Sequence, residues 1–228
     1  MPKIIFQNKD FIVVDKPVGM AVHEGVKTDE PTIVDFLLVK FPEIKNVGDD
    51  PETRPGIVHR LDKETSGVMV VARNQKAFGQ LKELFKNRQV EKKYLAVVHG
   101  RLKTKTGKIE GEMGRSKRDF RKQSLVRGKV KVRKERYSLT LYKALKEFND
   151  YSLLEVVPKT GRTHQIRVHL QSIGHPVVGD GKYTFKKYKK NRYPRMYLHA
   201  SEISFEFEGG NYCFKSGEAE NFLGDFGS

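Results

Sequence analysis

The sequence has 228 residues, of which 37% are hydrophobic and 32% are charged, and its formal net charge is +16. This composition excludes a disordered chain. Because no apolar run reaches the length of a membrane span and the N-terminus lacks a signal-peptide core, we expect a globular protein with no membrane partner. The single cysteine, Cys213, excludes an internal disulfide and a thiolate metal site, and it suits the reducing cytoplasm.

The first half of the chain predicts short strands alternating with helices. The expected elements are two strands within residues 3–15, a helix over residues 32–40 and a helix over residues 74–87. Thr32 and Asn74 are the predicted N-caps, since Thr and Asn side chains accept hydrogen bonds from the first turn of a helix. Residues 41–54 are polar and contain Pro and Gly, which predicts a loop.

The second half predicts more strands than helices. The expected elements are strands over residues 90–100, 137–145, 151–157 and 197–207, and a helix over residues 163–173. Thr163 is the predicted cap of that helix and Gly174 its end. Hairpin-joined strands mixed with helices indicate an α+β fold with a largely antiparallel sheet and flanking helices. We expect one domain over residues 1–215 and a mobile acidic tail over residues 216–228.

The positive charge is concentrated in two blocks. Residues 101–136 hold 15 Lys and Arg against four Asp and Glu, a net charge of +11, and residues 182–195 hold seven Lys and Arg and no acid, a net charge of +7. Blocks of this kind bind nucleic-acid phosphates, although many charge runs only solvate a surface. The blocks also contain aromatic residues that either stack on bases or face the core: Phe120, Tyr183, Phe185, Tyr188 and Tyr193. Within the first block, residues 129–133 alternate like an exposed strand.

The most informative stretch is His59-Arg60-Leu61-Asp62-Lys63-Glu64-Thr65-Ser66-Gly67, which lies between two apolar runs that read as buried strands. A charged loop held by two strands presents its residues from a rigid support. The neighbouring Arg60 and Lys63 favour an ionised Asp62, which is a candidate nucleophile. For an isolated Arg-x-Asp triplet, a surface turn with local ion pairs is the more common explanation.

The full stretch resembles the signature of the RluA-type pseudouridine synthases, and three further segments resemble motifs of that family in the same order. They are Asp15-Lys16-Pro17-Val18-Gly19, the strand Glu91-Lys92-Lys93-Tyr94-Leu95, and Thr160-Gly161-Arg162-Thr163-His164-Gln165-Ile166-Arg167, which continues to Gly179-Asp180 and Tyr183. The resemblance covers residues from about 5 to about 205. It implies the pseudouridine synthase fold.

The resemblance also implies a reaction, the isomerisation of uridine in RNA, with no metal or other cofactor. Asp62 would be the catalytic nucleophile or base, and Tyr94 would stack on the target base. Arg167 would pair with Asp62 and Ile166 would pack against the base. Arg162 is the second candidate for that pairing or for a phosphate contact. Arg60 would occupy the space left by the flipped uridine.

Other chemistries find less support in the sequence. None of the Gly-Lys pairs has the glycine that a P-loop needs five positions earlier, and no G-x-S-x-G elbow is present. His164 and His169 are five apart, which suits hydrogen bonding or capping better than shared zinc ligation. Two other functions remain open. A non-catalytic RNA chaperone or assembly factor has no need of Asp62, Tyr94 and Arg167 together, and a nucleoside or base hydrolase that uses the aspartate lacks a second motif carboxylate.

The place of the first motif bears on substrate choice. It begins by Asp15, which leaves no room in this sequence for the S4-like RNA-binding domain of larger relatives. We therefore expect the catalytic domain and its two basic blocks to recognise RNA. Small hairpin targets such as tRNA arms or exposed rRNA loops are favoured. We expect a cytoplasmic monomer.

Overall fold

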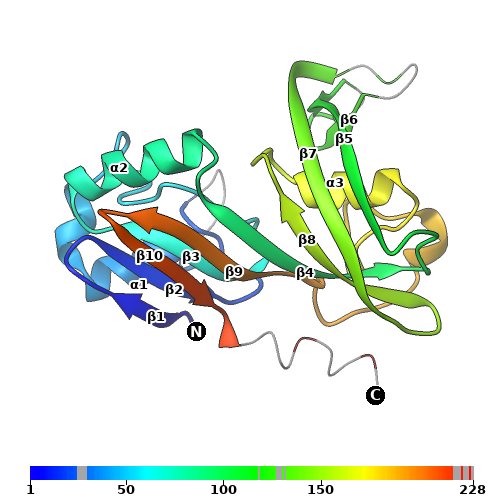
Figure 1. Cartoon of the computed structure of the whole chain (residues 1–228), viewed down its shortest axis with the longest axis horizontal. Coiled ribbons are helices and arrows are strands. Elements are labelled where there is room, and N and C mark those ends of the chain that lie inside the picture. Colours follow the sequence, from blue (N-terminus) through cyan, green and yellow to red (C-terminus); the bar gives the residue numbers. More distant parts are fainter. Residues whose placement is uncertain are drawn as a thin grey trace. The chain divides into compact units, whose positions relative to one another are not determined.

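The structure of the protein is a computed structural model that describes residues 1–24, 30–117, 119–126, 130, 132–217, 222 and 226. The chain forms two compact units: unit 1 comprises residues 1–92 and 199–220, and unit 2 comprises residues 93–198 and 221–228 (Figure 1). The expected domain over residues 1–215 is thus built from two units. No helix in these described ranges is long and apolar enough to cross a membrane.

Unit 1 contains a five-stranded mixed sheet. In spatial order its strands are β1 (Lys3–Gln7), β2 (Phe11–Lys16), β3 (Ser66–Ala72), β9 (Leu198–Phe207) and β10 (Gly210–Lys215). All neighbours pair antiparallel except β3 and β9, which pair in parallel over two residues. The two predicted strands are joined by a tight turn, in which the Asn8 side chain accepts hydrogen bonds from the N–H groups of Asp10 and Phe11.

The helices of unit 1 begin where the sequence predicted. Thr32 caps α1 (Ile33–Lys40) in a reciprocal capping box with Asp35, and Asn74 caps α2 (Gln75–Lys86) by accepting from the Ala77 N–H group. The α2 helix packs against β3. The loop predicted over residues 41–54 is partly wrong, because it includes the 3-10 helix η1 (Pro42–Asn46), whose Ile44 is buried.

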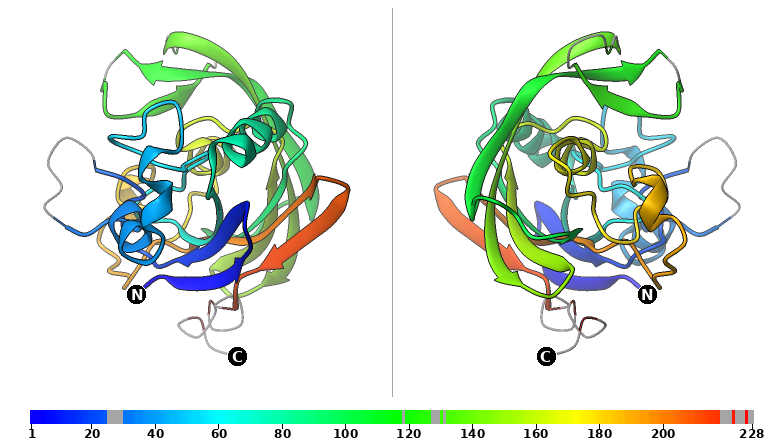
Figure 2. Two further views of the ribbon diagram at one scale, coloured as in Figure 1. Left: turned by 90° about the vertical axis from the view of Figure 1, so that its left-hand side faces the viewer. Right: turned by 90° about the vertical axis from the view of Figure 1, so that its right-hand side faces the viewer.

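Unit 2 contains a five-stranded antiparallel sheet that curves around a helix (Figure 2). In spatial order its strands are β4 (Glu91–His99), β8 (Tyr151–Pro158), β7 (Val132–Glu147), β5 (Thr106–Ser116) and β6 (Gln123–Leu125). The helix α3 (Gln165–Ser172) contacts β5, β6, β7 and β8. A short 3-10 helix, η2 (Lys186–Tyr188), lies in the second basic block. The predicted α+β class and the hairpin of β7 with β8 are confirmed.

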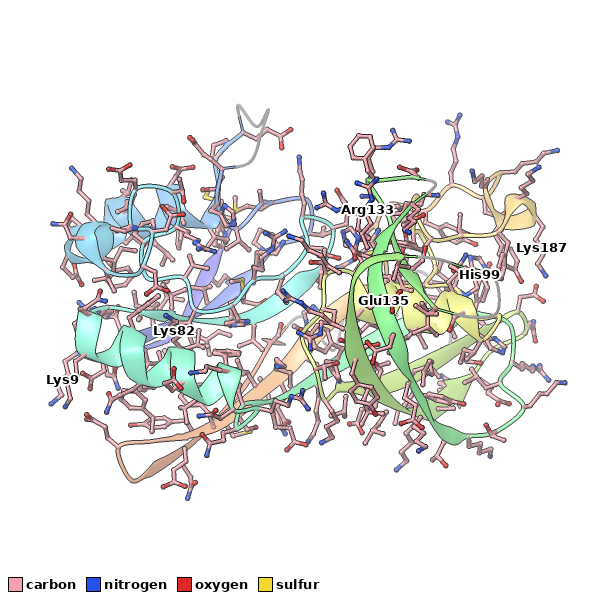
Figure 3. The ribbon with its side chains drawn as sticks, turned by 90° about the horizontal axis from the view of Figure 1, so that it is seen from above. Lys9, Lys82, His99, Arg133, Glu135 and Lys187 are labelled. Atoms are coloured by element: carbon pink, nitrogen blue, oxygen red, sulfur yellow. The ribbon has the colours of Figure 1, made fainter. Side chains whose placement is uncertain are left out.

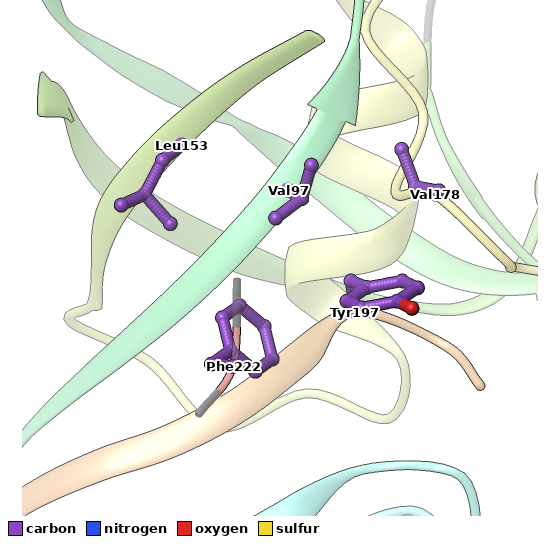
Figure 4. Packing of buried hydrophobic residues seen from close by; sticks show 5 residues of the cluster. All are labelled: Val97, Leu153, Val178, Tyr197 and Phe222. Carbon is purple, nitrogen blue, oxygen red and sulfur yellow. The ribbon is translucent and has the colours of Figure 1, made fainter. Parts of the chain in front are cut away.

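The core of unit 2 includes a residue from the predicted tail. Val97, Leu153, Val178 and Tyr197 pack together with Phe222, which is only 3% exposed (Figure 4). Burial of a phenylalanine contributes about 1.5–3 kcal/mol, so this part of the tail is anchored. Ser216, the first tail residue, is also buried. The prediction of mobility for the tail otherwise falls on residues 218–221, 223–225, 227 and 228, which lie outside the described residues.

Two further predictions need correction or restriction. The predicted Thr163 cap is wrong: the cap of α3 is His164, with a left-handed backbone and no side-chain capping bond. The exposed strand predicted over residues 129–133 lies partly outside the described residues, and β7 is described from Val132 onward.

Candidate functional site

The loop over residues 59–65 presents Asp62 just before β3, the middle strand of the sheet of unit 1. Leu61, immediately before it, is buried in the core of the unit. The Thr65 N–H group donates a 3.0 Å hydrogen bond to the Asp62 carbonyl oxygen, which closes a tight turn before β3. Asp62 itself is half-buried, so its carboxylate is supported by a fixed turn while keeping access to solvent.

A buried lysine holds this loop from the other side. The Lys16 ammonium donates hydrogen bonds to the carbonyl oxygens of Pro17 (3.0 Å), Met20 (2.7 Å) and Lys63 (3.0 Å). The Gly19 N–H group donates to the same Lys63 oxygen at 3.0 Å. A buried charge is tolerated only when hydrogen-bonded. Lys16 therefore ties the segment that follows β2 to the residue after Asp62.

His59 anchors the start of the loop as a neutral ring. Its Nε2 accepts a 3.0 Å hydrogen bond from the Val70 N–H group, and the ring stacks on Phe85 at a centroid distance of 4.4 Å. Burial, with a smaller effect of the Lys92 ammonium, lowers the pKa of His59 to about 3. The histidine of the signature is thus a structural hydrogen-bond acceptor at neutral pH.

The end of the signature fixes where β3 begins. Ser66 Oγ and His199 Nδ1 are hydrogen-bonded at 2.8 Å. Gly67 has φ near +116°, and a Cβ there would collide with the Ala200 carbonyl oxygen of β9. Only glycine permits this close approach of two strands, so the Ser-Gly pair of the signature sets the register that carries the Asp62 loop.

The two cationic neighbours of Asp62 behave differently. Lys63 forms an exposed ion pair with Glu30 at 2.7 Å, so its ammonium lies against a carboxylate other than Asp62. Arg60 is exposed, and among the described residues its side chain makes no hydrogen bond or ion pair. The Arg60 side chain is therefore free to move and does not brace the loop.

In unit 2, Gln165 positions the beginning of α3. Its side-chain oxygen accepts from Thr160 Oγ1 (2.6 Å) and from the Arg162 N–H group (3.1 Å), and its amide nitrogen donates to Leu139 and Thr140 of β7. These bonds, and not the predicted Thr163 cap, hold the beginning of the helix. They fasten the motif that contains Ile166 and Arg167 to the sheet.

Arg167 is held by a buried, two-pronged ion pair. Its Nε and Nη2 donate to the two carboxylate oxygens of Asp180 at 2.7 and 2.9 Å, and its guanidinium lies 5.1 Å from the centre of the Tyr183 ring. Burial alone raises the pKa of Asp180. The hydrogen bonds and charge of Arg167, with the N–H groups of Tyr183 and Lys182, hold that pKa below its ordinary value. The predicted pairing of Arg167 with Asp62 joins the two units and stays a prediction.

The other predicted residues of unit 2 lie on three elements. Tyr94 lies on β4 opposite Val156 and is largely buried, and Ile166 is buried in the first turn of α3. Arg162 precedes the helix, and its Nε donates to the Tyr137 carbonyl oxygen at 3.1 Å. Their roles toward a uridine stay predictions.

Most aromatic residues of the basic blocks are buried or half-buried: Tyr183 is buried, and Phe185, Tyr188 and Tyr193 are half-buried. Tyr188 stacks on His99 with ring centres 3.8 Å apart. Lys187 lies on the same side of unit 2 as His99 (Figure 3). The hydroxyl of Tyr193 is 3.1 Å from that of Tyr151. Phe120, between β5 and β6, is the exception, with 74% of its surface exposed.

Sequence reasoning missed three residues that shape the site: Lys16, Gln165 and Asp180. Each lies inside a motif quoted for the resemblance, but Lys16 binds backbone carbonyls, Gln165 also bonds to the distant strand β7, and Asp180 pairs with Arg167 of a different segment. A buried lysine at the end of an apolar strand was the one usable signal. Within the described ranges, no three His, Cys, Asp or Glu side chains gather closely enough to hold a metal ion.

Comparison with known proteins places the chain in a family. The model of the RNA pseudouridylate synthase family matches residues 10–172. Ribosomal large subunit pseudouridine synthase D of Borreliella burgdorferi is 39% identical over 79% of this chain and 54% of its own length. An uncharacterised RNA pseudouridine synthase of Aquifex aeolicus is 44% identical over 80% of this chain and 56% of its own length. The chain thus spans little more than half of these curated relatives.

Solved structures give the same answer. Human RNA pseudouridylate synthase domain containing 1 matches with a TM-score of 0.80 and 28% identity, covering 95% of this chain and 83% of that one. Human RNA pseudouridylate synthase domain containing 4 matches with a TM-score of 0.74 and 28% identity, covering 97% of this chain and 91% of that one. The chain belongs to the RNA pseudouridylate synthase family.

Proposed function

We propose that the protein is an RNA pseudouridine synthase, an isomerase that converts specific uridines of structured RNA, in rRNA or tRNA, to pseudouridine. The observation that carries the proposal is the presentation of Asp62: a half-buried carboxylate on a turn that is fastened by the buried Lys16 ammonium and by a neutral His59. The membership of the family supports the same reaction.

Asp62 is the catalytic carboxylate in this proposal. The glycosidic C–N bond of uridine breaks, the uracil turns, and a C–C bond forms to the same sugar carbon, while the base loses a proton from carbon and gains one on nitrogen. The product is an isomer, so no atom is added and no redox partner is needed. Asp62 either attacks the sugar as a nucleophile or removes a proton as a base.

The residues of unit 2 bind the same uridine. Tyr94 stacks on the base, Ile166 packs against it, and Arg167 pairs with Asp62, with Arg162 as the second candidate for that pairing or for a phosphate. The anchoring of Arg167 by Asp180 supports its role, because an arginine whose orientation is fixed loses less entropy when it binds a second carboxylate.

Arg60 fills the space that the uridine leaves. A base inside an RNA helix is reached only by flipping, and this costs a few kcal/mol of lost stacking and pairing. The exposed side chain of Arg60, two residues before Asp62, is suited to contact the neighbouring bases.

The test is to incubate the purified protein with total RNA and to map pseudouridine at nucleotide resolution. A pseudouridine synthase produces new pseudouridines at a few defined positions. An RNA chaperone binds RNA and leaves no modification, and a base hydrolase leaves abasic sites. Either of these two outcomes would overturn the proposal. We further propose a cytoplasmic monomer that works without a cofactor, which the RNA substrate and the single cysteine support.

A further inference from the structure

We infer that unit 2 carries an RNA-phosphate groove, which binds phosphates of the RNA substrate; this inference rests on the proposed function. The groove has a volume of about 520 Å³ and lies between the β5–β7 ribbon and the residues before α3. Five of its described lining residues are cationic and none is acidic: Arg115, Arg133, Lys134, Arg136 and Arg162.

A β-bulge brings the cations of β7 together. In a regular strand, consecutive side chains point to opposite faces, so Arg133 and Lys134 would not share a groove. Here the pairing slips between Met113 and Arg115, and Lys134 adopts a left-handed backbone with φ of 55°. A bulge of this kind re-aims side chains, and an unfavourable backbone often marks a functional segment.

Gly114 on the opposite strand makes the bulge possible. A Cβ at Gly114 would collide with the Arg133 carbonyl oxygen. As a result, Arg133, Lys134 and Arg136 all line the groove, whereas Glu135, the one acidic residue of this stretch, lies outside the lining. Arg133 and Glu135 are labelled on the strand in Figure 3.

The charges of the groove are not neutralised within the described part of the chain. Arg115, Arg133, Lys134 and Arg136 are exposed and make no ion pair there. Farther along the same ribbon the pattern is different: Lys108 pairs with Glu110 at 2.7 Å, and Tyr137 donates to the same carboxylate. The charges in one part of the ribbon are thus neutralised by ion pairs, and those in the groove are not. A surface that is merely solvated gives no reason for this difference.

The groove stands on a rigid base. Met113, Leu125, Val168 and Tyr183 form a buried cluster that joins β5 and β6 to α3. The Tyr183 hydroxyl accepts from the Gln123 N–H group at 2.8 Å and is 2.8 Å from His164 Nδ1. Cations on such a support lose little backbone entropy when they bind a ligand.

The exposed ring of Phe120 favours RNA over an acidic protein as the ligand. The groove residues Arg115 and Gln123 pair directly across β5 and β6, and Phe120 lies in the turn that joins these two strands. Arginine forks bind phosphates and carboxylates alike. An exposed aromatic ring in the turn of the same hairpin adds a surface on which a base stacks, and base–aromatic stacking is worth about 1–3 kcal/mol.

The first experiment removes charge from the groove. The triple variant Arg115→Gln, Arg133→Gln, Arg136→Gln is compared with the matched variant Lys3→Gln, Lys9→Gln, Lys45→Gln, which removes three exposed cations of unit 1. Binding of a fluorescein-labelled RNA hairpin is measured between low and moderate salt. The groove variant should bind at least about tenfold more weakly, and its slope of log affinity against log salt should be smaller by about 2–3. Equal losses in both variants would overturn the inference.

The second experiment tests the base contact and the ligand class. Phe120→Ala should weaken binding of the hairpin about fivefold or more without changing the salt slope, because stacking releases no counterion. Unlabelled poly-glutamate should compete poorly. Competition by poly-glutamate at the same charge concentration would identify an acidic-protein surface and overturn the inference.

These outcomes are independent of the proposed reaction. Pseudouridine is measured separately in total RNA with the wild-type protein. If the wild-type protein modifies RNA but the groove variant binds as tightly, the groove inference fails and the function stands. If the groove governs binding but no pseudouridine forms, the proposed function fails and the groove stands.

Discussion

The Asp62 loop of unit 1 and the phosphate groove of unit 2 use charge in opposite ways. The loop keeps the Asp62 carboxylate half-buried, and the next residue is held through its carbonyl oxygen by the ammonium of Lys16 and the N–H group of Gly19. The groove gathers five cations, of which four are exposed on a bulged ribbon and the fifth, Arg162, precedes α3.

We expect changes in the loop to affect the position of the Asp62 carboxylate, and changes in the groove to affect the affinity for RNA. A group that forms or breaks bonds must be held within a fraction of an ångström, so single changes around the loop should lower rate or stability. Exposed cations act through long-range attraction that salt screens. Each charge removed from the groove should therefore lower the affinity for RNA further. Single substitutions test how strictly each unit holds its proposed functional residues.

The largest effect is expected at the buried ion pair of unit 2. Asp180→Asn removes the charge that faces Arg167 and should lower the free energy of unfolding by about 3–5 kcal/mol, because the guanidinium stays buried without its counter-charge. Urea unfolding measures the loss. The matched control Asp150→Asn changes an exposed aspartate and should stay within about 0.5 kcal/mol. A similar small loss for Asp180→Asn would show that the pair does not anchor Arg167.

The next effect concerns the clamp of the Asp62 loop. Lys16→Met keeps the shape of the side chain but leaves the carbonyl oxygens of Pro17, Met20 and Lys63 without their donor. We expect a loss of about 3 kcal/mol in the free energy of unfolding, since each buried unsatisfied group costs about 1–3 kcal/mol. Lys9→Met, at an exposed position, is the control. If both variants unfold at the same urea concentration, Lys16 does not fasten the loop.

Arg60 should show a substrate-dependent effect. If it fills the gap left by a flipped uridine, Arg60→Ala should slow modification of a structured hairpin by up to about a hundredfold and affect a single-stranded fragment with the same uridine less, because the flipping cost is a few kcal/mol only in a stacked context. Single-turnover rates on the matched pair measure this. Equal losses on both RNAs would remove the base-flipping role.

The smallest effect is a pH dependence of stability in unit 1. The pKa of His59 is about 3 in the folded protein and near 6.5 in the unfolded chain, so the unfolded state binds the proton first. Stability is therefore full above about pH 6.5 and falls as the pH drops toward 3. Between pH 7 and pH 5 the loss from His59 is at most about 2 kcal/mol.

The control for this pH effect is His59→Gln, which removes the titrating ring. His99, whose pKa burial and Lys187 lower to about 4, acts with the same sign in both proteins. The wild type should therefore lose more stability on acidification than the variant. Parallel curves would show that His59 is solvated when folded.

Local signals predicted much of the fold. The strands follow apolar runs such as Val68–Ala72, and the caps Thr32 and Asn74 were predicted correctly because their hydrogen bonds lie within one helical turn. The cap of α3 was predicted wrongly because its role passes to Gln165, whose partners Leu139 and Thr140 lie on a strand that is distant in sequence.

The site could be predicted from the sequence where a motif residue acts by itself. It could not be predicted where residues from separate segments meet only in the folded chain. Asp62, Arg60 and Arg167 could be named from the motifs. The three carbonyl oxygens around Lys16 meet only in the folded chain. The bulge at Lys134 overrides the alternation on which a sequence reading of the basic block depends, so the groove could not be foreseen.

The most direct test of the central claim is the single-turnover rate of Asp62→Asn on the mapped uridine, measured beside its RNA affinity. Asparagine keeps the shape of the side chain and removes the carboxylate that we propose breaks the glycosidic bond. We predict a rate lowered by at least about a thousandfold with RNA affinity within about threefold of the wild type. A variant that still forms pseudouridine at nearly the wild-type rate would contradict the assignment of Asp62 as the catalytic residue.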